Sequence, residues 1–423
     1  MRDITLTRNR KRAIWYFVFV AFIIPTIQVS GLTIVVGRFI PNLLGYNLLA
    51  FILSAPLWKN FNKNYGNLRG VVMSILVLTI YIIVTFMVTA DDTSFMAALT
   101  VFRHSYMQVL NLLILLPFMF SLKKEEVNYA LHCMFKCLIV FTFIYLSNNL
   151  IYDWLGVKGG LVENVNGATM DRSIIGMPLY DPVWTALLMT YVLHKVPKAN
   201  KYMILILLAI IISFTRSTLF STLIVISVVA LMSILKNLHN ISRTFKILAI
   251  IFVCILFIAI FMPNVLEFWI AKLLNTFNND LKYNAGTLAF REELIDNALY
   301  AIRNNPLFGL GYVRDVAKGE YSMVMGSDTY IAPILWCEGW LGIILRTLPF
   351  FILGLNSILS ISTKNKGYYL DIIIIASITV AVINFKQTNM ITNYPLTLGI
   401  IILLKIKDNY DRKTQDFSNN SIL

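Results

Sequence analysis

The sequence is dominated by apolar runs long enough to cross a membrane. A helix needs about 17 to 25 mostly apolar residues to cross roughly 30 Å of hydrocarbon. Twelve candidate segments meet or approach this requirement, at approximately 13–29, 39–57, 70–90, 97–120, 128–151, 179–194, 202–215, 217–235, 247–264, 341–359, 369–385 and 392–405. The sequence therefore predicts an all-α integral membrane protein of about twelve transmembrane helices, forming one polytopic domain over residues 1–423.

Composition supports this class and argues against a soluble one. Hydrophobic residues make up 58% of the chain and charged residues 14%, and the mean hydropathy is +0.71. A soluble core of this length would be more mixed. The net charge of +14 could suggest nucleic acid, but the basic residues lie in short clusters between apolar runs. That pattern orients a membrane protein, so no nucleic-acid partner is expected.

The basic clusters fall in alternate linkers, which sets the expected orientation. They are Arg8, Arg10, Lys11 and Arg12; Lys59, Lys63 and Arg69; Lys123 and Lys124; Lys195, Lys198 and Lys201; Lys236, Arg243 and Lys246; Lys364 and Lys366; and Lys405, Lys407, Arg412 and Lys413. By the positive-inside rule, these linkers and both termini are expected in the cytoplasm. The first apolar run lacks a small-residue cleavage site and is interpreted as a retained anchor.

Residue types that usually hold metals or nucleotides form no recognisable pattern. The four cysteines lie in or beside apolar runs and are expected to be buried free thiols: Cys133, Cys137, Cys254 and Cys337. The four histidines have no ligand-like spacing: His104, His132, His194 and His239. No P-loop or glycine-rich dinucleotide motif is present. We therefore expect neither a metal nor another cofactor, and an ATP-driven pump is disfavoured.

Little polar chain remains for the outer side. It comprises a short loop near Asp91 and Asp92, a loop at about 152–179, and one long polar segment at about 266–340. Any chemistry facing outward must be built from these loops and the nearby ends of the spans.

The long loop contains an amphipathic helix-like run with an arginine on its apolar side. Residues 287–304 precede Asn305-Pro306, which should stop the helix, and Gly309 and Gly311 should supply a turn. At about 100° per residue, one half of the wheel holds Phe290, Leu294, Ile295, Ala298, Leu299 and Ile302. Arg291 falls near the middle of that half. Its side chain either snorkels to the membrane surface or presents its planar donor fork to a phosphate.

Another arginine of the same helix-like run has a different expected environment. Arg303 falls on the polar half with Glu292, Glu293 and Asp296. It is expected to be solvated and to pair with its helical neighbours.

A second arginine interrupts the apolar stretch at about 202–235. Only about fourteen apolar residues precede Arg216, and at about 1.5 Å per residue they climb roughly 21 Å, short of the hydrocarbon thickness. Arg216 should therefore lie below the outer surface and face a cavity or an anionic partner. The alternative is an interfacial arginine beside locally thinned lipid.

Other charged residues near the spans are weaker candidates. Arg172 lies in the 152–179 loop and could simply pair with a nearby aspartate. Arg103 and His104 lie at the outer mouth of the fourth span, where interfacial anchoring is the simpler reading. Lys136 and Arg346 lie within or near apolar spans and are candidates for structural ion pairs, but the sequence names no clear partner for either.

The end of the long loop predicts a short surface helix, a glycine break and a span that re-enters the membrane. These correspond to residues 331–338, Gly339 and the apolar run at 341–359. Just before the short helix, Asp328 or Ser327 could serve as a helix N-cap. Alternatively, Asp328 is a carboxylate at the membrane surface that accepts a proton from a sugar hydroxyl.

Several of these motifs together resemble one known family. They are residues 214–219 (FTRSTL) around Arg216, residues 291–311 ending in NPLFGLG, Asp328-Thr329-Tyr330, and residues 338–342 (EGWLG). In this order, with twelve spans and one large outer loop, they resemble the O-antigen ligase and polymerase superfamily. Residues 172–176 (RSIIG) also look like that family's arginine in the preceding outer loop.

The resemblance implies a bacterial inner-membrane glycosyltransferase that needs no metal and works on the periplasmic side. Its donor would be a glycan linked to undecaprenyl diphosphate. By this analogy Arg172, Arg216 and Arg291 would bind the diphosphate and stabilise it as it leaves, with 266–340 and 152–179 as periplasmic loops. The chemistry of the arginine side chain agrees with this role. Negative charge accumulates on the diphosphate as it leaves, and preorganised hydrogen-bond donors at that point lower the reaction barrier. A chain-length regulator is a further partner that the family implies.

One position distinguishes the two branches of the family. The ligase branch is expected to carry a histidine where this chain has Asp328, so the resemblance favours a Wzy-type polymerase. Such an enzyme moves the growing glycan from one lipid carrier to the terminal sugar of the next lipid-linked repeat unit. Asp328 is then the candidate base, with Tyr330 beside it. Glu338 competes for that role, although a solvated surface position is its simpler reading.

Two alternative functions remain open from the sequence. One is a ligase that moves finished glycan onto lipid A core, and the other is a polysaccharide flippase without bond chemistry. A transporter should place charges near mid-membrane in broken helices, often in repeated halves. The arginines of this chain cluster toward one face instead, which favours the glycosyltransferases.

Overall fold

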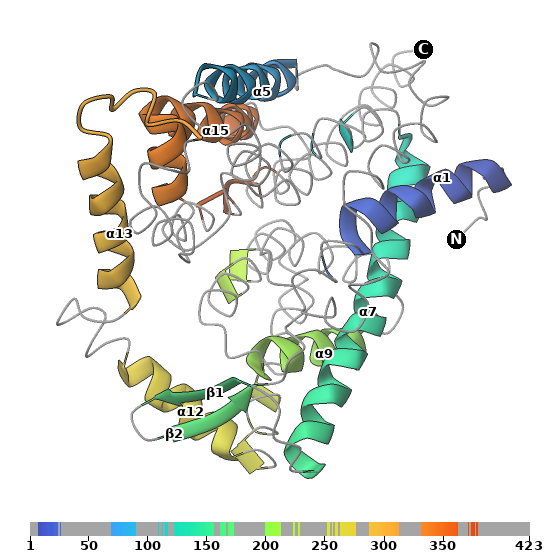
Figure 1. Ribbon diagram of the computed structural model, residues 1–423. Coiled ribbons are helices and arrows are strands. Elements are labelled where there is room, and N and C mark those ends of the chain that lie inside the picture. Colours follow the sequence, from blue (N-terminus) through green and yellow to red (C-terminus); the bar gives the residue numbers. More distant parts are fainter. Residues whose placement is uncertain are drawn as a thin grey trace.

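The computed structural model is helical, with one small hairpin (Figure 1). The structure describes residues 7–23, 69–89, 122–155, 161–165, 168–172, 199–212, 263–275, 287–312 and 331–362, with a few isolated helical positions between them. The helices over these residues are α1 (Arg8–Val18), its π-helical continuation η1 (Phe19–Ile23), α5 (Arg69–Thr89), α7 (Lys124–Leu155), α9 (Ala199–Ile212), α12 (Pro263–Asn275), α13 (Thr287–Ala301) and α15 (Ile331–Ser362). The strands are β1 (Leu161–Val165) and β2 (Ala168–Arg172).

Within the described residues, three helices are long and apolar enough to cross a membrane. They run over Arg69–Val88, Glu125–Asn148 and Ile331–Ile361. The membrane class is therefore confirmed, and these helices correspond to the spans predicted at 70–90, 128–151 and 341–359. The helix α9 coincides with most of the run predicted at 202–215. Most of the other predicted spans lie outside the described residues.

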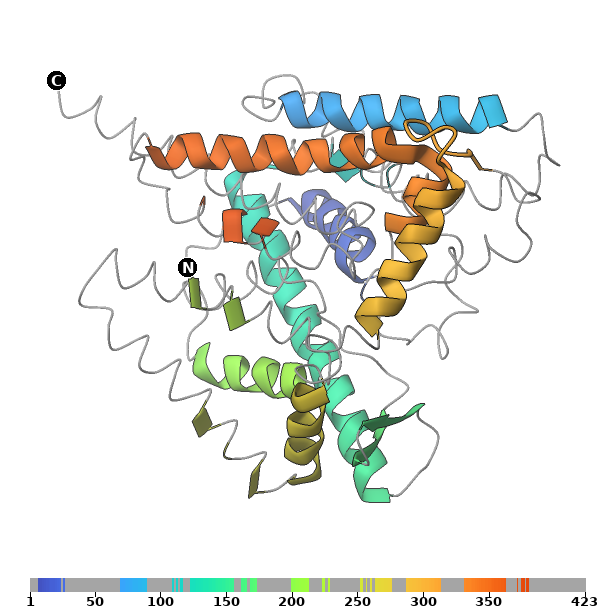
Figure 2. The same ribbon diagram turned by 90° about the vertical axis from the view of Figure 1, so that its left-hand side faces the viewer.

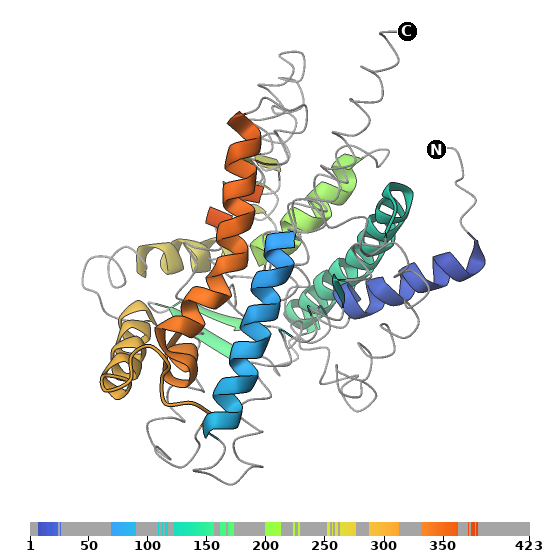
Figure 3. The same ribbon diagram turned by 90° about the horizontal axis from the view of Figure 1, so that it is seen from above.

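Helices α5 and α15 lie side by side along much of their length (Figures 2 and 3). They run antiparallel, because Gly70 at the start of α5 faces Ile352 of α15, while Tyr81 further along α5 bonds to Glu338 near the start of α15. On α5 the buried side chains recur at helical spacing: Val71, Ile75, Leu78, Ile82 and Phe86. The opposite side is apolar and exposed, as suits a face turned toward lipid: Ile80, Val84, Met87 and Val88.

Helix α1 is fixed to α7 by a partly buried ion pair. The Arg10 guanidinium donates two hydrogen bonds to the Glu126 carboxylate, from Nε to Oε1 and, at 2.7 Å, from Nη2 to Oε2. The same carboxylate accepts the backbone N–H of Lys123 at 2.8 Å. Glu126 therefore both caps the first turn of α7 and joins it to the N-terminal helix.

The hairpin is a departure from the all-α expectation. Strands β1 and β2 pair antiparallel, with Leu161 opposite Arg172 and Val165 opposite Ala168, and α12 packs against both strands. Only Asn166 and Gly167 connect them. An Asn-Gly pair is a strong signal for a two-residue hairpin turn, so the sequence carried this information. The whole hairpin lies within the loop predicted at 152–179.

Candidate functional site

Helix α15 is broken at Gly339, where the sequence predicted a break between a short helix and a span. Gly339 has φ 62° and ψ −163°, a conformation outside the helix and essentially restricted to glycine. The residues before it form the predicted short helix, and the residues after it form the span. The predicted order of helix, glycine break and span is thus confirmed, but the short helix is not at the surface, because seven of its eight residues are buried.

A preceding segment of the chain docks on this break. In the described structure, four backbone hydrogen bonds join residues 306–311 to residues 336–341. They are Leu310 N to Trp336 O at 2.7 Å, Gly311 N to Cys337 O at 3.0 Å, Trp340 N to Pro306 O at 2.9 Å and Leu341 N to Leu307 O at 3.0 Å. We call residues 305–311, together with 336–341, the loop–helix joint.

The joint restores the hydrogen bonds that the break removes. In an unbroken helix the N–H of Trp340 would bond to the carbonyl of Trp336, and that of Leu341 to the carbonyl of Cys337. The break separates these four groups, and each of them instead finds a partner in the loop. A buried backbone group left without a partner costs about 1 to 3 kcal/mol. The NPLFGLG segment is therefore what makes a break in this helix tolerable.

Close backbone approach explains two glycines of the joint. Gly309 has φ 72°, and a Cβ added there would lie 2.6 Å from the Trp336 carbonyl oxygen. A Cβ on Gly339 would lie 2.5 Å from the Leu307 carbonyl oxygen and 2.6 Å from the Gly309 nitrogen. Both distances are far inside van der Waals contact, so the two backbones can meet only where side chains are absent.

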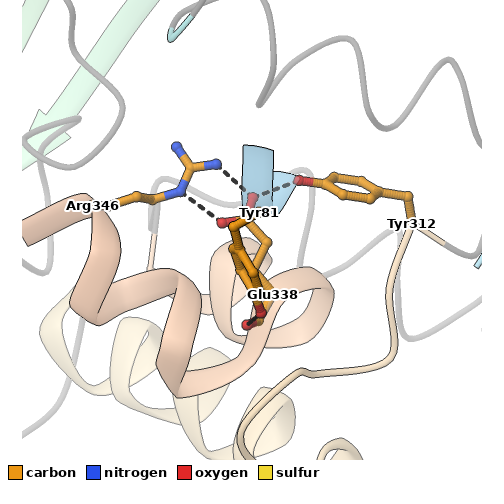
Figure 4. A network of polar contacts seen from close by, with 4 residues as sticks. All are labelled: Tyr81, Tyr312, Glu338 and Arg346. Carbon is orange, nitrogen blue, oxygen red and sulfur yellow. Dashed lines mark hydrogen bonds and ion pairs between the residues drawn. The ribbon is translucent and has the colours of Figure 1, made fainter. Parts of the chain in front are cut away.

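A buried polar cluster lies beside the joint (Figure 4). The Glu338 carboxylate accepts hydrogen bonds from Tyr312 OH to Oε1 at 2.5 Å, from Arg346 Nη2 to Oε1 at 2.5 Å and from Arg346 Nε to Oε2 at 2.8 Å. All three side chains are fully buried, and Glu338 and Arg346 each have 0% exposure. Gly342 leaves room for the carboxylate, since a Cβ there would lie 2.7 Å from Glu338 Oε2.

Two further groups complete the surroundings of this cluster. The Tyr81 hydroxyl of α5 donates to the backbone carbonyl of Glu338 at 2.6 Å, and the ring of Phe86 contacts the ring of Tyr312 edge-on. Burial, reinforced by the Glu338 charge, raises the pKa of the Tyr312 hydroxyl well above its ordinary value. Tyr312 therefore stays protonated and acts as a donor. Arg346 Nη1 is buried without a hydrogen-bond partner in the described structure.

The cluster shows that the surface position expected for Glu338 was wrong, and it identifies the ion-pair partner of Arg346. Glu338 is not a solvated surface residue, because the docked loop and helix α5 cover it. Arg346 is a member of a structural ion pair, as its place in an apolar span suggested, and its partner is Glu338. Lys136 is exposed on α7.

Helix α13 presents the expected apolar face to the rest of the protein. Leu294, Ala298 and Ile302 are buried, while Glu293 and Asp296 are exposed. The helix packs against α15. The backbone position of Arg291 is one turn before Leu294, on the same side of the helix as Ala298. Its side chain lies outside the described part of the structure.

The neighbouring arginine behaves as the wheel predicted. Arg303 is exposed, and its guanidinium lies 4.5 Å from the centre of the Tyr300 ring. The guanidinium therefore makes a cation–π contact with the tyrosine ring.

The remaining candidate residues can be placed only in part. Arg172 is the last residue of β2, on the hairpin that packs against α12, and its side chain is not described. Outside the described residues lie Arg103, His104, Arg216, Asp328 and Tyr330. What the structure brings together is the helix that carries Arg291 and the short helix that follows Asp328.

Sequence reasoning missed Tyr81 and Tyr312 and undervalued Glu338. A signal for the pair existed, because an arginine inside a span needs an anionic partner and Glu338 is the acidic residue nearest to Arg346 in the sequence. The two tyrosines carried no such signal. Their roles depend on the docking of α5 and of the 306–311 loop.

In a comparison with known protein families, residues 202–333 match the family described as O-antigen ligase. This match supports the chain's resemblance to the O-antigen ligase and polymerase superfamily. The matched region contains Arg216, Arg291 and Asp328, together with the loop half of the joint. No curated protein matches the chain.

Proposed function

We propose that this protein is an O-antigen or related surface-polysaccharide polymerase. It would transfer a growing glycan from undecaprenyl diphosphate to the terminal sugar of a lipid-linked repeat unit. The observation that carries the proposal is the family match over 202–333, a region that includes Arg216, Arg291 and Asp328. The loop–helix joint supports it, because it connects the helix of Arg291 to the helix that follows Asp328.

The chemistry follows from where charge changes during the transfer. A hydroxyl oxygen of the acceptor sugar forms a bond to the anomeric carbon, and the bond from that carbon to the diphosphate oxygen breaks. The electron pair leaves with the diphosphate, and the hydroxyl proton passes to a base. Arg216 and Arg291, with Arg172, are proposed to bind the diphosphate through their planar donor forks. Asp328 is the proposed base.

The expected depth of the arginines fits a lipid-linked donor. The diphosphate of a polyprenyl carrier lies at the membrane surface, with its apolar tail in the bilayer. A guanidinium recessed below the outer surface, as proposed for Arg216, can meet that diphosphate while excluding bulk water, and electrostatic stabilisation is stronger there than in water. The site would face the periplasm, with both termini in the cytoplasm.

A ligase is the second candidate, favoured by the description of the matching family as O-antigen ligase. It would use the same donor and the same diphosphate contacts but a lipid A core acceptor. Asp328 is the residue that favours the polymerase, since the ligase branch is expected to carry histidine there. A chain-length regulator is a proposed partner of the polymerase.

A deletion mutant separates the candidate functions through the glycan that reaches the cell surface. The polymerase proposal predicts lipid A core carrying a single repeat unit. Bare core with assembled polymer still on its carrier would instead identify a ligase. Loss of surface glycan with precursors facing the cytoplasm would identify a flippase.

Complementation of that mutant tests the proposed diphosphate contacts. We expect Arg291→Ala to lower chain extension by about 100-fold or more, the usual effect of losing one donor to a developing anion. Arg303→Ala is the matched control, because this arginine lies in the turn just after the same helix and is exposed. It should extend chains like the wild type. Near-normal glycan ladders from Arg291→Ala, at equal protein levels, would remove Arg291 from the site.

A further inference from the structure

The polar cluster beside the joint contains a fully buried carboxylate for which the proposed reaction has no assigned role. We propose that Glu338 and Arg346 are a positioning pair. They fix the angle between the short helix at 331–338 and the span, and thereby set that helix, which follows Asp328 in the sequence, relative to the arginine-bearing helix α13. This inference rests on the proposed function, because positioning matters only if Asp328 and Arg291 act on one substrate.

The surroundings of Glu338 exclude it as the group that meets a sugar hydroxyl. Oε1 accepts from Tyr312 and Arg346, and Oε2 accepts from Arg346. The side chain has no exposed surface, and the added space at Gly342 is filled by the carboxylate itself. An acceptor hydroxyl could reach either oxygen only by displacing the side chains that cover the carboxylate.

The location of the pair fits a positioning role. Glu338 is the last residue before the break at Gly339, and Arg346 lies in the span after it. At the break the amides of Trp340 and Leu341 bond to the loop instead of to the preceding helical turn, so the helical ladder holds the two parts together less firmly there. The ion pair crosses this point, Tyr312 attaches the loop to it, and Tyr81 attaches α5. Four segments therefore converge on one residue.

The charge of the pair also makes it sensitive to single substitutions. Two opposite charges at bonding distance in a buried place stabilise each other, but either one alone is an uncompensated charge. A break stabilised in this way should lose its geometry when one charge is removed. It should recover when both charges are removed and the remaining side chains can bond to each other.

The test compares three variants: Glu338→Gln, Arg346→Gln, and the double variant with both changes. Each is purified in full length, and initial rates with lipid-linked repeat units are measured across pH. We expect each single variant to lower kcat by about 100-fold, as misplacement of reacting groups by about 1 Å can do. The double variant should return to within about tenfold of the wild type, because it contains no uncompensated charge.

The pH profile separates positioning from proton transfer. A positioning residue changes the height of the profile but leaves its acidic inflection in place, since that inflection belongs to another base. If Glu338 were the base, the acidic limb would disappear in Glu338→Gln, and the double variant would be as inactive as the single. Either of these results would overturn the proposal, as would full activity of both single variants.

A readout independent of activity separates this inference from the proposed function. The amides of Leu310 and Gly311 donate to the carbonyls of Trp336 and Cys337, so their hydrogen exchange reports whether the joint is closed. We expect faster exchange at 305–312 in both single variants and protection restored in the double variant. Unchanged exchange in the single variants would refute the pair's role whatever reaction the enzyme catalyses.

A milder variant keeps the test available if the single charge variants do not insert. Tyr312→Phe removes one hydrogen bond to Glu338 and leaves both charges paired. It should lower kcat several-fold with an unchanged pH inflection, whereas a wild-type kcat would contradict the positioning role.

Discussion

Replacing Gly339 with alanine should open the loop–helix joint. The residue has φ 62° and ψ −163°, and a Cβ there would lie 2.5 Å from the Leu307 carbonyl oxygen and 2.6 Å from the Gly309 nitrogen. Keeping the joint closed costs about 1 to 3 kcal/mol for the backbone conformation. Relieving the clash costs about 1 to 3 kcal/mol more.

The alternative for the variant is to release the loop. Release forfeits the four backbone hydrogen bonds of the joint, each worth about 1 kcal/mol net and more where the groups remain away from water. The two routes cost similar amounts. The two costs of the closed joint add up to a loss of about 2 to 6 kcal/mol in its stability.

Hydrogen exchange at 305–312 is the assay, because a polytopic protein need not unfold in one step. Gly354→Ala is the matched control on the same helix. A Cβ there would lie 3.8 Å from Ile378 Cδ1, an ordinary contact, and alanine favours a helix over glycine by about 1 kcal/mol. Exchange should accelerate in Gly339→Ala and not in Gly354→Ala. Equal protection in the two variants would refute the steric reasoning.

Three other predictions follow from the same contacts. Gly309→Ala should weaken the joint much as Gly339→Ala does, measured as faster exchange at 305–312, because its Cβ would lie 2.6 Å from a carbonyl oxygen. The raised pKa of Tyr312 means that its hydroxyl's stabilising bond is fully present below about pH 10 and is lost only as pH rises above that value. The melting temperatures of wild type and Tyr312→Phe should therefore differ by a constant amount between pH 6 and 9, and a gap that closes within this window would be inconsistent with that shift. Arg10→Gln should weaken the attachment of α1 to α7 by about 1 to 3 kcal/mol, which should appear as faster proteolysis of the N-terminal helix. Arg8→Gln is the control, because Arg8 is exposed on the same helix. Equal cleavage rates in the two variants would show that the ion pair between Arg10 and Glu126 does not hold α1 in place.

Local patterns in the sequence were enough for part of the fold. Apolar length identified the three spans that the structure describes, and the 3.6-residue period identified the buried side of α13. The break at Gly339 was predictable because a glycine follows a short helix and precedes an apolar run. Each of these features depends on neighbours within a few turns of the same helix.

The features that escaped prediction depend on distant contacts. Glutamate is a residue type typical of protein surfaces, and Glu338 is buried only because residues 306–312 and α5 pack over it. No periodicity reports that docking. The same holds for Tyr81, which looks like any aromatic residue in a span until its hydroxyl is placed against the Glu338 carbonyl.

The hairpin was missed for a different reason. Its turn signal, Asn166-Gly167, was present, but the assumption that a membrane protein of this class is all-helical left it unused. For the diphosphate site, the sequence supplied the candidate arginines, and the family match covers Arg216 and Arg291. Their meeting around one substrate remains a proposal.

The most direct test of the central claim is extension in vitro with one substrate and one enzyme. Purified protein is incubated with purified undecaprenyl-diphosphate-linked repeat units alone, and products are separated by length, with the new linkage read by NMR. The account predicts a ladder of lipid-linked glycans that grows by whole repeat units and is absent with Arg291→Ala. Transfer that occurs only after lipid A core is added would contradict it.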